Sequence, residues 1–200
     1  AVPEKIARGA MLGPDVSVLE IGPGIGSLTR ALAARSGEVF ALEIDRALSP
    51  VLDETLSDLN NVSVVFGDVL KTDLRAFAAE RFSFTKAVAV SNLPYYITAK
   101  TITVLLKAGI FRAVTVMLQK ETARKITAGP SDADRCLFGV IVNHYSIPVK
   151  LFSVPAGSFY PTPKVDSVVL RLEIKPRGEN AEQNELFLAV ARAAFASRRK

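Results

Sequence analysis

The stretch Asn92-Leu93-Pro94-Tyr95 follows the apolar run at residues 86–91. An amide, a proline and an aromatic ring at the end of such a run suit a flat ring that carries an amine, most plausibly adenine. The Asn92 side-chain oxygen and the Leu93 carbonyl can accept both N–H groups of the amine, so that its nitrogen becomes pyramidal and directs its lone pair outward. Pro94 fixes the backbone between these acceptors, and Tyr95 can stack on the base.

A second stretch, residues 20–27, contains three glycines in the order G-x-G-x-G after an acid, Glu20. Gly22, Gly24 and Gly26 lie between a predicted strand and a predicted helix, where a missing side chain lets the backbone approach a ligand closely. The spacing differs from the G-x-G-x-x-G of dinucleotide-binding proteins and is the form used by S-adenosylmethionine-dependent methyltransferases. The alternative is a tight strand-to-helix turn that binds nothing.

Two acids end the second and third predicted strands. Glu43 is placed to accept hydrogen bonds from both hydroxyls of a ribose, and Asp68 to accept the adenine amine of a cofactor. Their neighbours Ile44 and Val69 are included in the predicted cofactor site. Each acid alone would be an ordinary strand-end or turn residue, so the prediction depends on their occurring together.

The elements that must position these residues alternate along the chain. Strands are predicted at 17–21, 38–44, 62–66, 86–91 and 112–118, and helices at 27–36, 46–59, about 98–108, from 120, and at 137–145. Their continuous apolar character is typical of buried parallel strands. Two further strands, 150–155 and 167–174, have only a proline-rich connection between them, which predicts an antiparallel pair. The fold class is α/β, a Rossmann-like, mostly parallel sheet with an antiparallel edge strand.

The carboxyl ends of parallel strands meet at one end of the sheet, where such folds bind ligands. We therefore expect the glycine loop, Glu43, Asp68 and Asn92 to lie together. S-adenosyl-L-methionine, the predicted cofactor, already carries an activated methyl group, so catalysis needs in-line positioning and desolvation rather than a general base. The target base must be single-stranded or extruded to reach this site.

Composition narrows the class of protein. The 200 residues carry a formal charge of +5, which suits a nucleic-acid partner without requiring one. The single cysteine, Cys136, and the single histidine, His144, exclude an internal disulfide and a cysteine-built zinc site, and both are interpreted as structural. No apolar stretch is long enough to span a membrane. We expect a cytoplasmic monomer without a metal.

Residues 1–175 are predicted to form the catalytic domain. Residues 175–185 are polar and contain Gly and Pro, so they are predicted to be a loop or linker. A helical pattern follows and ends in the basic residues Arg198, Arg199 and Lys200. We interpret residues 176–200 as a linker and the start of a truncated C-terminal helical region.

The chain resembles the ribosomal RNA adenine dimethyltransferases that act on the small subunit. The resemblance rests on the stretches VLEIGPGIGSLTRAL, FALEID, GDVL, SNLPYYIT, VMLQKETARKITAGP, SFYPTPKVDSVVLRL and AFASRRK. It implies a class I S-adenosylmethionine-dependent methyltransferase that dimethylates N6 of two adjacent adenines near the 3′ end of small-subunit ribosomal RNA, on the immature subunit.

The resemblance also implies substrate contacts. Tyr95 and Phe159 would form an aromatic clamp on the base, and Lys164, Arg198 and Arg199 would contact RNA. The alternative for Phe159 is a core residue of a proline-rich turn. Three departures from the family pattern stand out: no Gln-Asn-Phe-Leu stretch precedes the first helix, no helical domain follows the last residue, and Arg135-Cys136 replaces Tyr-Gly.

Other functions remain open at this point. An erythromycin-resistance-type methyltransferase would use the same chemistry on one adenine of large-subunit RNA. A non-catalytic RNA-binding or ribosome-assembly factor could retain the fold, although it would not need the Asn-Leu-Pro-Tyr motif. A nicotinamide-dependent oxidoreductase does not fit the glycine spacing.

Overall fold

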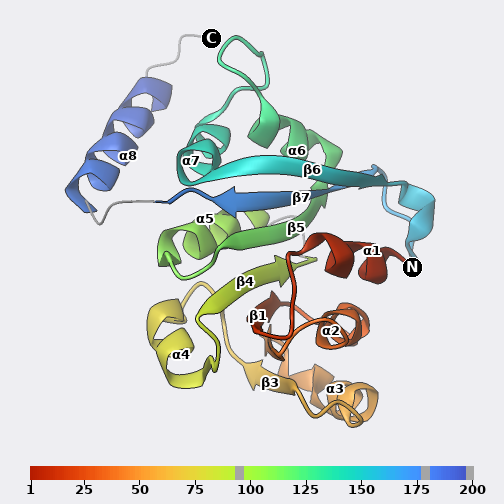
Figure 1. The fold of residues 1–200 in the computed structure, drawn as a ribbon. Coiled ribbons are helices and arrows are strands. Elements are labelled where there is room, and N and C mark those ends of the chain that lie inside the picture. Colours follow the sequence, from red (N-terminus) through yellow and green to blue (C-terminus); the bar gives the residue numbers. More distant parts are fainter. Residues whose placement is uncertain (93–96, 177–180, 197–200) are drawn as a thin grey trace.

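The computed structural model describes residues 1–92, 97–176 and 181–196, and its centre is a seven-stranded sheet (Figure 1). The strand order is β3-β2-β1-β4-β5-β7-β6, and β7 runs in the opposite direction to the other six strands. The strands are β1 (Val16–Ile21), β2 (Glu38–Glu43), β3 (Val62–Phe66), β4 (Lys86–Ser91), β5 (Ala113–Gln119), β6 (Ser146–Val154) and β7 (Ser167–Ile174). The predicted α/β class, the parallel core and the antiparallel pair are confirmed.

Helices cover both faces of the sheet, as Figure 1 shows. They are α1 (Val2–Gly9), α2 (Ser27–Ala33), α3 (Ser49–Leu56), α4 (Leu74–Arg81), α5 (Thr98–Ala108), α6 (Lys120–Thr127), α7 (Leu137–Tyr145) and α8 (Ala181–Ala196), with short 3₁₀ turns η1 (Arg46–Leu48) and η2 (Ala156–Ser158). One apolar cluster packs helices α1 and α2 against one face of the sheet. A second cluster packs helices α4, α5, α6 and α7 against the opposite face. Because both faces are covered, every residue of β1 is buried, including the polar residues Ser17 and Glu20.

The predicted single helix at 46–59 is divided in two. Asp45 accepts a hydrogen bond from the backbone N–H of Ala47 and begins η1, and α3 follows with Pro50 in its first turn, where a proline costs no helical hydrogen bond. The structure also contains two helices that the sequence reasoning did not name, α1 and α4. The signal for α4 is Asp73, whose side chain accepts the N–H groups of the first turn.

Two boundaries were wrong. β6 begins at Ser146 rather than near 150, because its early proline, Pro148, is tolerated in a strand at the edge of a sheet. The predicted loop at 175–185 ends earlier, because α8 begins at Ala181. Gln183, Asn184 and Glu185 in its first turns are polar, and polarity alone was mistaken for a loop.

Helix α8 lies beside α7 (Figure 1). The His144 ring stacks on Phe187 with 3.7 Å between ring centroids, and its Nε2 atom is 3.1 Å from the Asn184 side-chain oxygen. Leu188 is almost fully buried. These contacts attach α8 to the rest of the domain. They agree with the interpretation of His144 as a structural residue.

Candidate active site

At the carboxyl end of the sheet, the segments that follow β1, β2 and β3 are connected to one another by backbone hydrogen bonds. The N–H of Gly22 donates to the carbonyl of Leu42 at 3.0 Å, which attaches the glycine loop to the end of β2. The N–H of Gly67 donates to the carbonyl of Glu43 at 2.8 Å, which attaches the Asp68 turn to the same strand. The hydrogen bonding between neighbouring strands therefore continues beyond the strand ends. It holds together three segments of the predicted site: the glycine loop, Glu43 and the Asp68 turn.

Asn92 is held beside the glycine loop by a side chain. In the pairing of β1 with β4, Ile21 lies opposite Ser91, so the next residues, Gly22 and Asn92, leave the sheet side by side. The buried Ser91 hydroxyl donates to the Ile21 carbonyl at 2.7 Å and joins the two strand ends. Asn92 itself is exposed. The predicted meeting of Asn92 with the glycine loop agrees with this register.

The glycines of the loop are required for two different reasons. All three have positive φ, 69° at Gly22, 58° at Gly24 and 84° at Gly26, a region that costs other residues free energy. A Cβ atom at Gly22 or Gly24 would meet nothing within 4 Å, so the backbone there faces open space. A Cβ at Gly26 would lie 2.9 Å from the Leu56 side chain. The first two leave room for a ligand, and the third lets α2 approach α3.

The Glu43 carboxylate, at the end of β2, forms a hydrogen bond with this loop. Its two oxygens accept the N–H of Asp45 at 2.9 Å and the N–H of Gly24 at 3.4 Å, and the side chain is only 5% exposed. A carboxylate has about four acceptor positions, so capacity remains for ribose hydroxyls. The next residue, Ile44, is 68% exposed, an unusual state for a large apolar side chain beside a rigid acid.

Asp68 lies in a tight turn after β3. Its Oδ1 atom accepts the N–H of Leu70 at 2.9 Å, and its carbonyl accepts the Thr72 hydroxyl at 2.9 Å. The side chain is half-buried, and the adjacent Val69 is buried. These bonds fix the direction of the carboxylate without using its second oxygen within the described part of the chain.

Glu20 differs from the other acids because it is fully buried. Neither of its oxygens has a hydrogen-bond partner among the described residues, and neither does the hydroxyl of Thr29 nearby. Burial raises the pKa of the Glu20 carboxyl to about 7, the Thr29 hydroxyl opposes the shift, and the charge of Glu43 adds to it. Glu20 lies beneath the glycine loop as a group that is partly protonated at neutral pH.

These features fit S-adenosyl-L-methionine. A nucleoside needs acceptors for its hydroxyls and amine and an apolar surface for its base, and Glu43, Asp68 and Ile44 offer these at one end of the sheet. The open backbone of the glycine loop leaves space for the remainder of the molecule. A second exposed apolar side chain, Ile25, stands on that loop.

The entire chain, residues 1–200, matches the sequence model described as ribosomal RNA adenine dimethylase. The chain belongs to this family. It is 40% identical to the ribosomal RNA small subunit methyltransferase A of Alkaliphilus metalliredigens over 98% of its own length and 69% of that protein. It is 42% identical to the enzyme of the same name from Geobacillus thermodenitrificans, over 98% of its length and 68% of that protein.

Solved structures of the adenine dimethylase kind share the fold. The dimethyladenosine transferase from Plasmodium falciparum has a TM-score of 0.80 and 28% identity over all of this chain and 70% of that one. The 23S rRNA methyltransferase ErmE has a TM-score of 0.77 and 30% identity over 98% of this chain and 76% of that one. The predictions of a class I methyltransferase fold, an rRNA adenine dimethyltransferase and S-adenosyl-L-methionine as methyl donor are confirmed.

Several predicted site residues of this dimethylase lie outside the described residues: Leu93, Pro94, Tyr95, Arg198 and Arg199. Phe159 is half-buried and packs against the apolar cluster of α1 and α2, while Lys164 is exposed on the same β6–β7 connection. The connection also carries Tyr160, a fully exposed aromatic side chain that the sequence reasoning did not name. Its position in a turn, between Gly157 and Pro161, could have indicated that this aromatic side chain is exposed.

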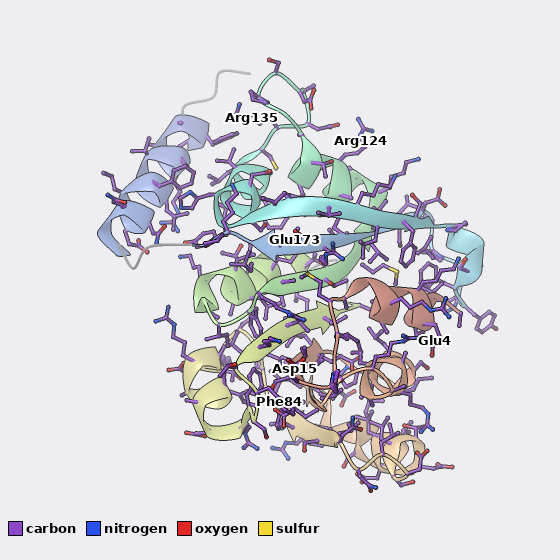
Figure 2. The ribbon with its side chains drawn as sticks, in the orientation of Figure 1. Glu4, Asp15, Phe84, Arg124, Arg135 and Glu173 are labelled. Carbon is purple, nitrogen blue, oxygen red and sulfur yellow. The ribbon has the colours of Figure 1, made fainter. Side chains whose placement is uncertain are left out.

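The Arg135-Cys136 departure has a local structural role. The Cys136 sulfur caps α7 by accepting the N–H of Gly139 at 3.5 Å, and the Arg135 guanidinium donates to the Pro130 carbonyl at 2.9 Å. Figure 2 shows Arg135 on the loop after α6 and Arg124 on α6 itself. Both residues lie on the loop and helix that border a cavity of about 440 Å³ facing α8.

Within residues 1–92, 97–176 and 181–196, no three His, Cys, Asp or Glu side chains are grouped so that they could hold a metal ion. A search of the same residues finds no helix with the length and apolar character needed to cross a membrane.

Proposed function

We propose that this chain dimethylates N6 of two adjacent adenines near the 3′ end of small-subunit ribosomal RNA, and that it does so on the immature small subunit in the cytoplasm, as a monomer. The observation that carries the proposal is the Ser91–Ile21 hydrogen bond, because it sets Asn92, the acceptor for the target amine, beside the glycine loop of the cofactor site.

In this proposal each side chain binds or orients. Glu43 accepts the ribose hydroxyls of the cofactor, Asp68 accepts its adenine amine, and Ile44 and Val69 contact its base. When bound, S-adenosyl-L-methionine supplies an electrophilic methyl group. Asn92 accepts one N–H of the target amine and keeps the nitrogen lone pair directed at that group.

The remaining predicted roles extend this arrangement. The Leu93 carbonyl accepts the second N–H, Pro94 fixes its position, and Tyr95 and Phe159 hold the two faces of the base. The amine nitrogen loses its proton to water after the methyl group has been transferred, so no side chain is required as a general base. Methyl transfer thus needs no histidine, and the single histidine, His144, instead contacts Phe187 and Asn184 of α8.

The choice of the small subunit is supported by the relatives. Those that are 40–42% identical over 98% of the chain are named small subunit methyltransferase A, whereas ErmE, which acts on 23S RNA, is 30% identical. Lys164, Arg198 and Arg199 are proposed RNA contacts. We also propose residues 1–175 as the catalytic domain and residues 176–200 as a linker followed by the start of a C-terminal helical region, to which α8 (Ala181–Ala196) belongs.

The test offers the protein both possible substrates. Small subunits and large subunits that lack adenine dimethylation are incubated separately with the protein and radiolabelled S-adenosyl-L-methionine, and label is counted in each RNA. We expect label in the small-subunit RNA alone. Label confined to large-subunit RNA would favour an erythromycin-resistance-type enzyme, and cofactor binding without label in either would favour an assembly factor.

A further inference from the structure

Exposed lysines stand at the carboxyl end of the sheet. Lys71 follows β3, Lys100 lies in the first turn of α5 after β4, Lys120 begins α6 directly after β5, and Lys164 lies on the β6–β7 connection. Within the described ranges, none of these four side chains forms an ion pair. This end of the sheet therefore presents a row of ammonium groups to solvent.

Acids at the same end are held by backbone N–H groups and, within the described residues, form no ion pair with the four lysines. The side chains of Asp45, Asp68 and Asp166 accept the N–H groups of Ala47, Leu70 and Ala156 respectively, each at 2.9–3.0 Å. Glu43 is used in the same way by the glycine loop. These acids keep their charge, but none of them pairs with a lysine of the row in the part of the chain that the structure describes, so the four ammonium groups stay accessible to an anionic ligand.

Two of the lysines lie on the helices that follow β4, the strand before Asn92, and its neighbour β5. The cofactor residues lie on β1, β2 and β3, so the substrate must approach from the side of β4 and β5. Lys100 is on the helix that follows β4, and Lys120 is on the helix that follows the neighbouring strand. The backbone N–H of Lys120 donates to the Asp166 carbonyl at 3.0 Å, which fixes it against the β6–β7 connection.

We propose that Lys100 and Lys120 bind the RNA phosphates on either side of the target adenine. An extruded base leaves its sugar-phosphate backbone bent, so the strand must be held on both sides of the site. Helices α5 and α6 both begin at this end, so the partial positive charge of each helix N-terminus adds to that of its lysine. The proposal rests on the proposed function, because it assumes an RNA substrate at Asn92.

The test compares two double variants that lose the same charge. Lys100→Ala/Lys120→Ala removes the proposed contacts. Lys107→Ala/Lys150→Ala is the control, since Lys107 is an exposed lysine at the opposite end of α5 and Lys150 is exposed on the edge strand β6. Methylation of small subunits is measured against subunit concentration and salt, and binding of S-adenosyl-L-methionine is measured by calorimetry.

For the Lys100/Lys120 variant we expect KM for the subunit to rise about tenfold, with kcat and cofactor affinity close to wild type. The slope of log affinity against log salt should shrink by about 1.4, roughly 0.7 for each lost phosphate contact of a single strand. The control should keep the wild-type slope and KM.

Equal KM and equal salt slopes in the two variants would overturn the inference while leaving the proposed function in place. A fall in cofactor affinity in the Lys100/Lys120 variant alone would also overturn it, because the lysines would then serve the cofactor. Absence of methylation by the wild-type protein would refute the proposed function, and this inference with it.

Discussion

The two ends of the same sheet use polar side chains in opposite ways. At the amino end, where the parallel strands begin, the Glu38 carboxylate accepts the Ser17 hydroxyl at 2.5 Å, the Ser83 N–H at 2.7 Å and the Ser83 hydroxyl at 2.9 Å. Asp15 forms an ion pair with Lys86. Figure 2 shows Asp15 and Phe84 close together in this region.

At the carboxyl end, groups of every kind are left for a ligand. Asn92 and four lysines are exposed, Ile25 and Ile44 are more than 60% exposed, and Glu20 is buried with no hydrogen-bond partner in the described part of the chain. Burial of Glu20 costs free energy that no hydrogen bond among the described residues offsets. Polar groups at the amino end thus bind one another, whereas those at the carboxyl end are free for the ligand binding that we propose, as expected of a parallel α/β sheet.

Glu20, at the carboxyl end, is fully buried, whereas Glu38, at the amino end, is only partly buried. Burial raises the pKa of Glu20 from 4.5 to about 7, so the folded protein keeps a proton that the unfolded chain releases in that window. Stability should therefore fall as pH rises from about 4.5 to about 7, by up to about 3 kcal/mol. In Glu20→Gln this loss should disappear. Urea denaturation at about pH 5 and about pH 8 measures it, and an unchanged pH dependence would contradict the account.

Glu43 and Glu38 form a matched pair at opposite ends of β2. Glu43→Gln should weaken binding of S-adenosyl-L-methionine about 100-fold, because a charged acceptor for two hydroxyls is lost. Glu38→Gln should leave cofactor affinity unchanged and lower the free energy of unfolding by about 1 kcal/mol, since it weakens a hydrogen-bond network that is only partly buried. Calorimetry and denaturation of both variants provide the comparison. Equal losses of cofactor affinity would refute the division of roles.

Ser91 joins the end of β4 to the end of β1. Ser91→Ala removes the hydroxyl that donates to the Ile21 carbonyl, so the position of Asn92 relative to the glycine loop should become less defined. We expect kcat to fall about tenfold, because small misplacements cost much of an in-line transfer, with little change in cofactor affinity. Ser57→Ala, at an exposed serine after α3, is the control and should retain wild-type kcat. Equal kcat in the two variants would show that the hydrogen bond does not position Asn92.

The smallest expected effect is a loss of stability caused by backbone conformation alone, at a glycine where a Cβ atom would have room. A Cβ atom at Gly24 and one at Gly157 would each meet nothing within 4 Å, but Gly24 alone of this pair has positive φ. Gly24→Ala should therefore destabilise the fold by about 1 kcal/mol, whereas Gly157→Ala should be neutral or slightly stabilising. Thermal denaturation distinguishes the two. Equal changes would mean that the loop accommodates the strain.

Much of this arrangement could be predicted from the sequence. The continuous apolar runs predicted the parallel strands, and the acid, glycine and amide residues directly after them predicted which groups share the carboxyl end. The amino end was not anticipated, because Glu38, Ser17 and Ser83 are distant in sequence and resemble ordinary surface residues. The start of α8 was missed for a related reason, since the helix depends on contacts with His144 that polarity does not reveal.

The central claim is that Asn92, set beside the glycine loop, directs methyl transfer to an adenine amine. The most direct test incubates wild-type protein and Asn92→Ala with S-adenosyl-L-methionine and unmethylated small ribosomal subunits, digests the RNA and quantifies dimethyladenosine by mass spectrometry. The account predicts dimethyladenosine from the wild type and a loss of at least about 100-fold in the variant, with cofactor binding retained. Equal product from both proteins would contradict it.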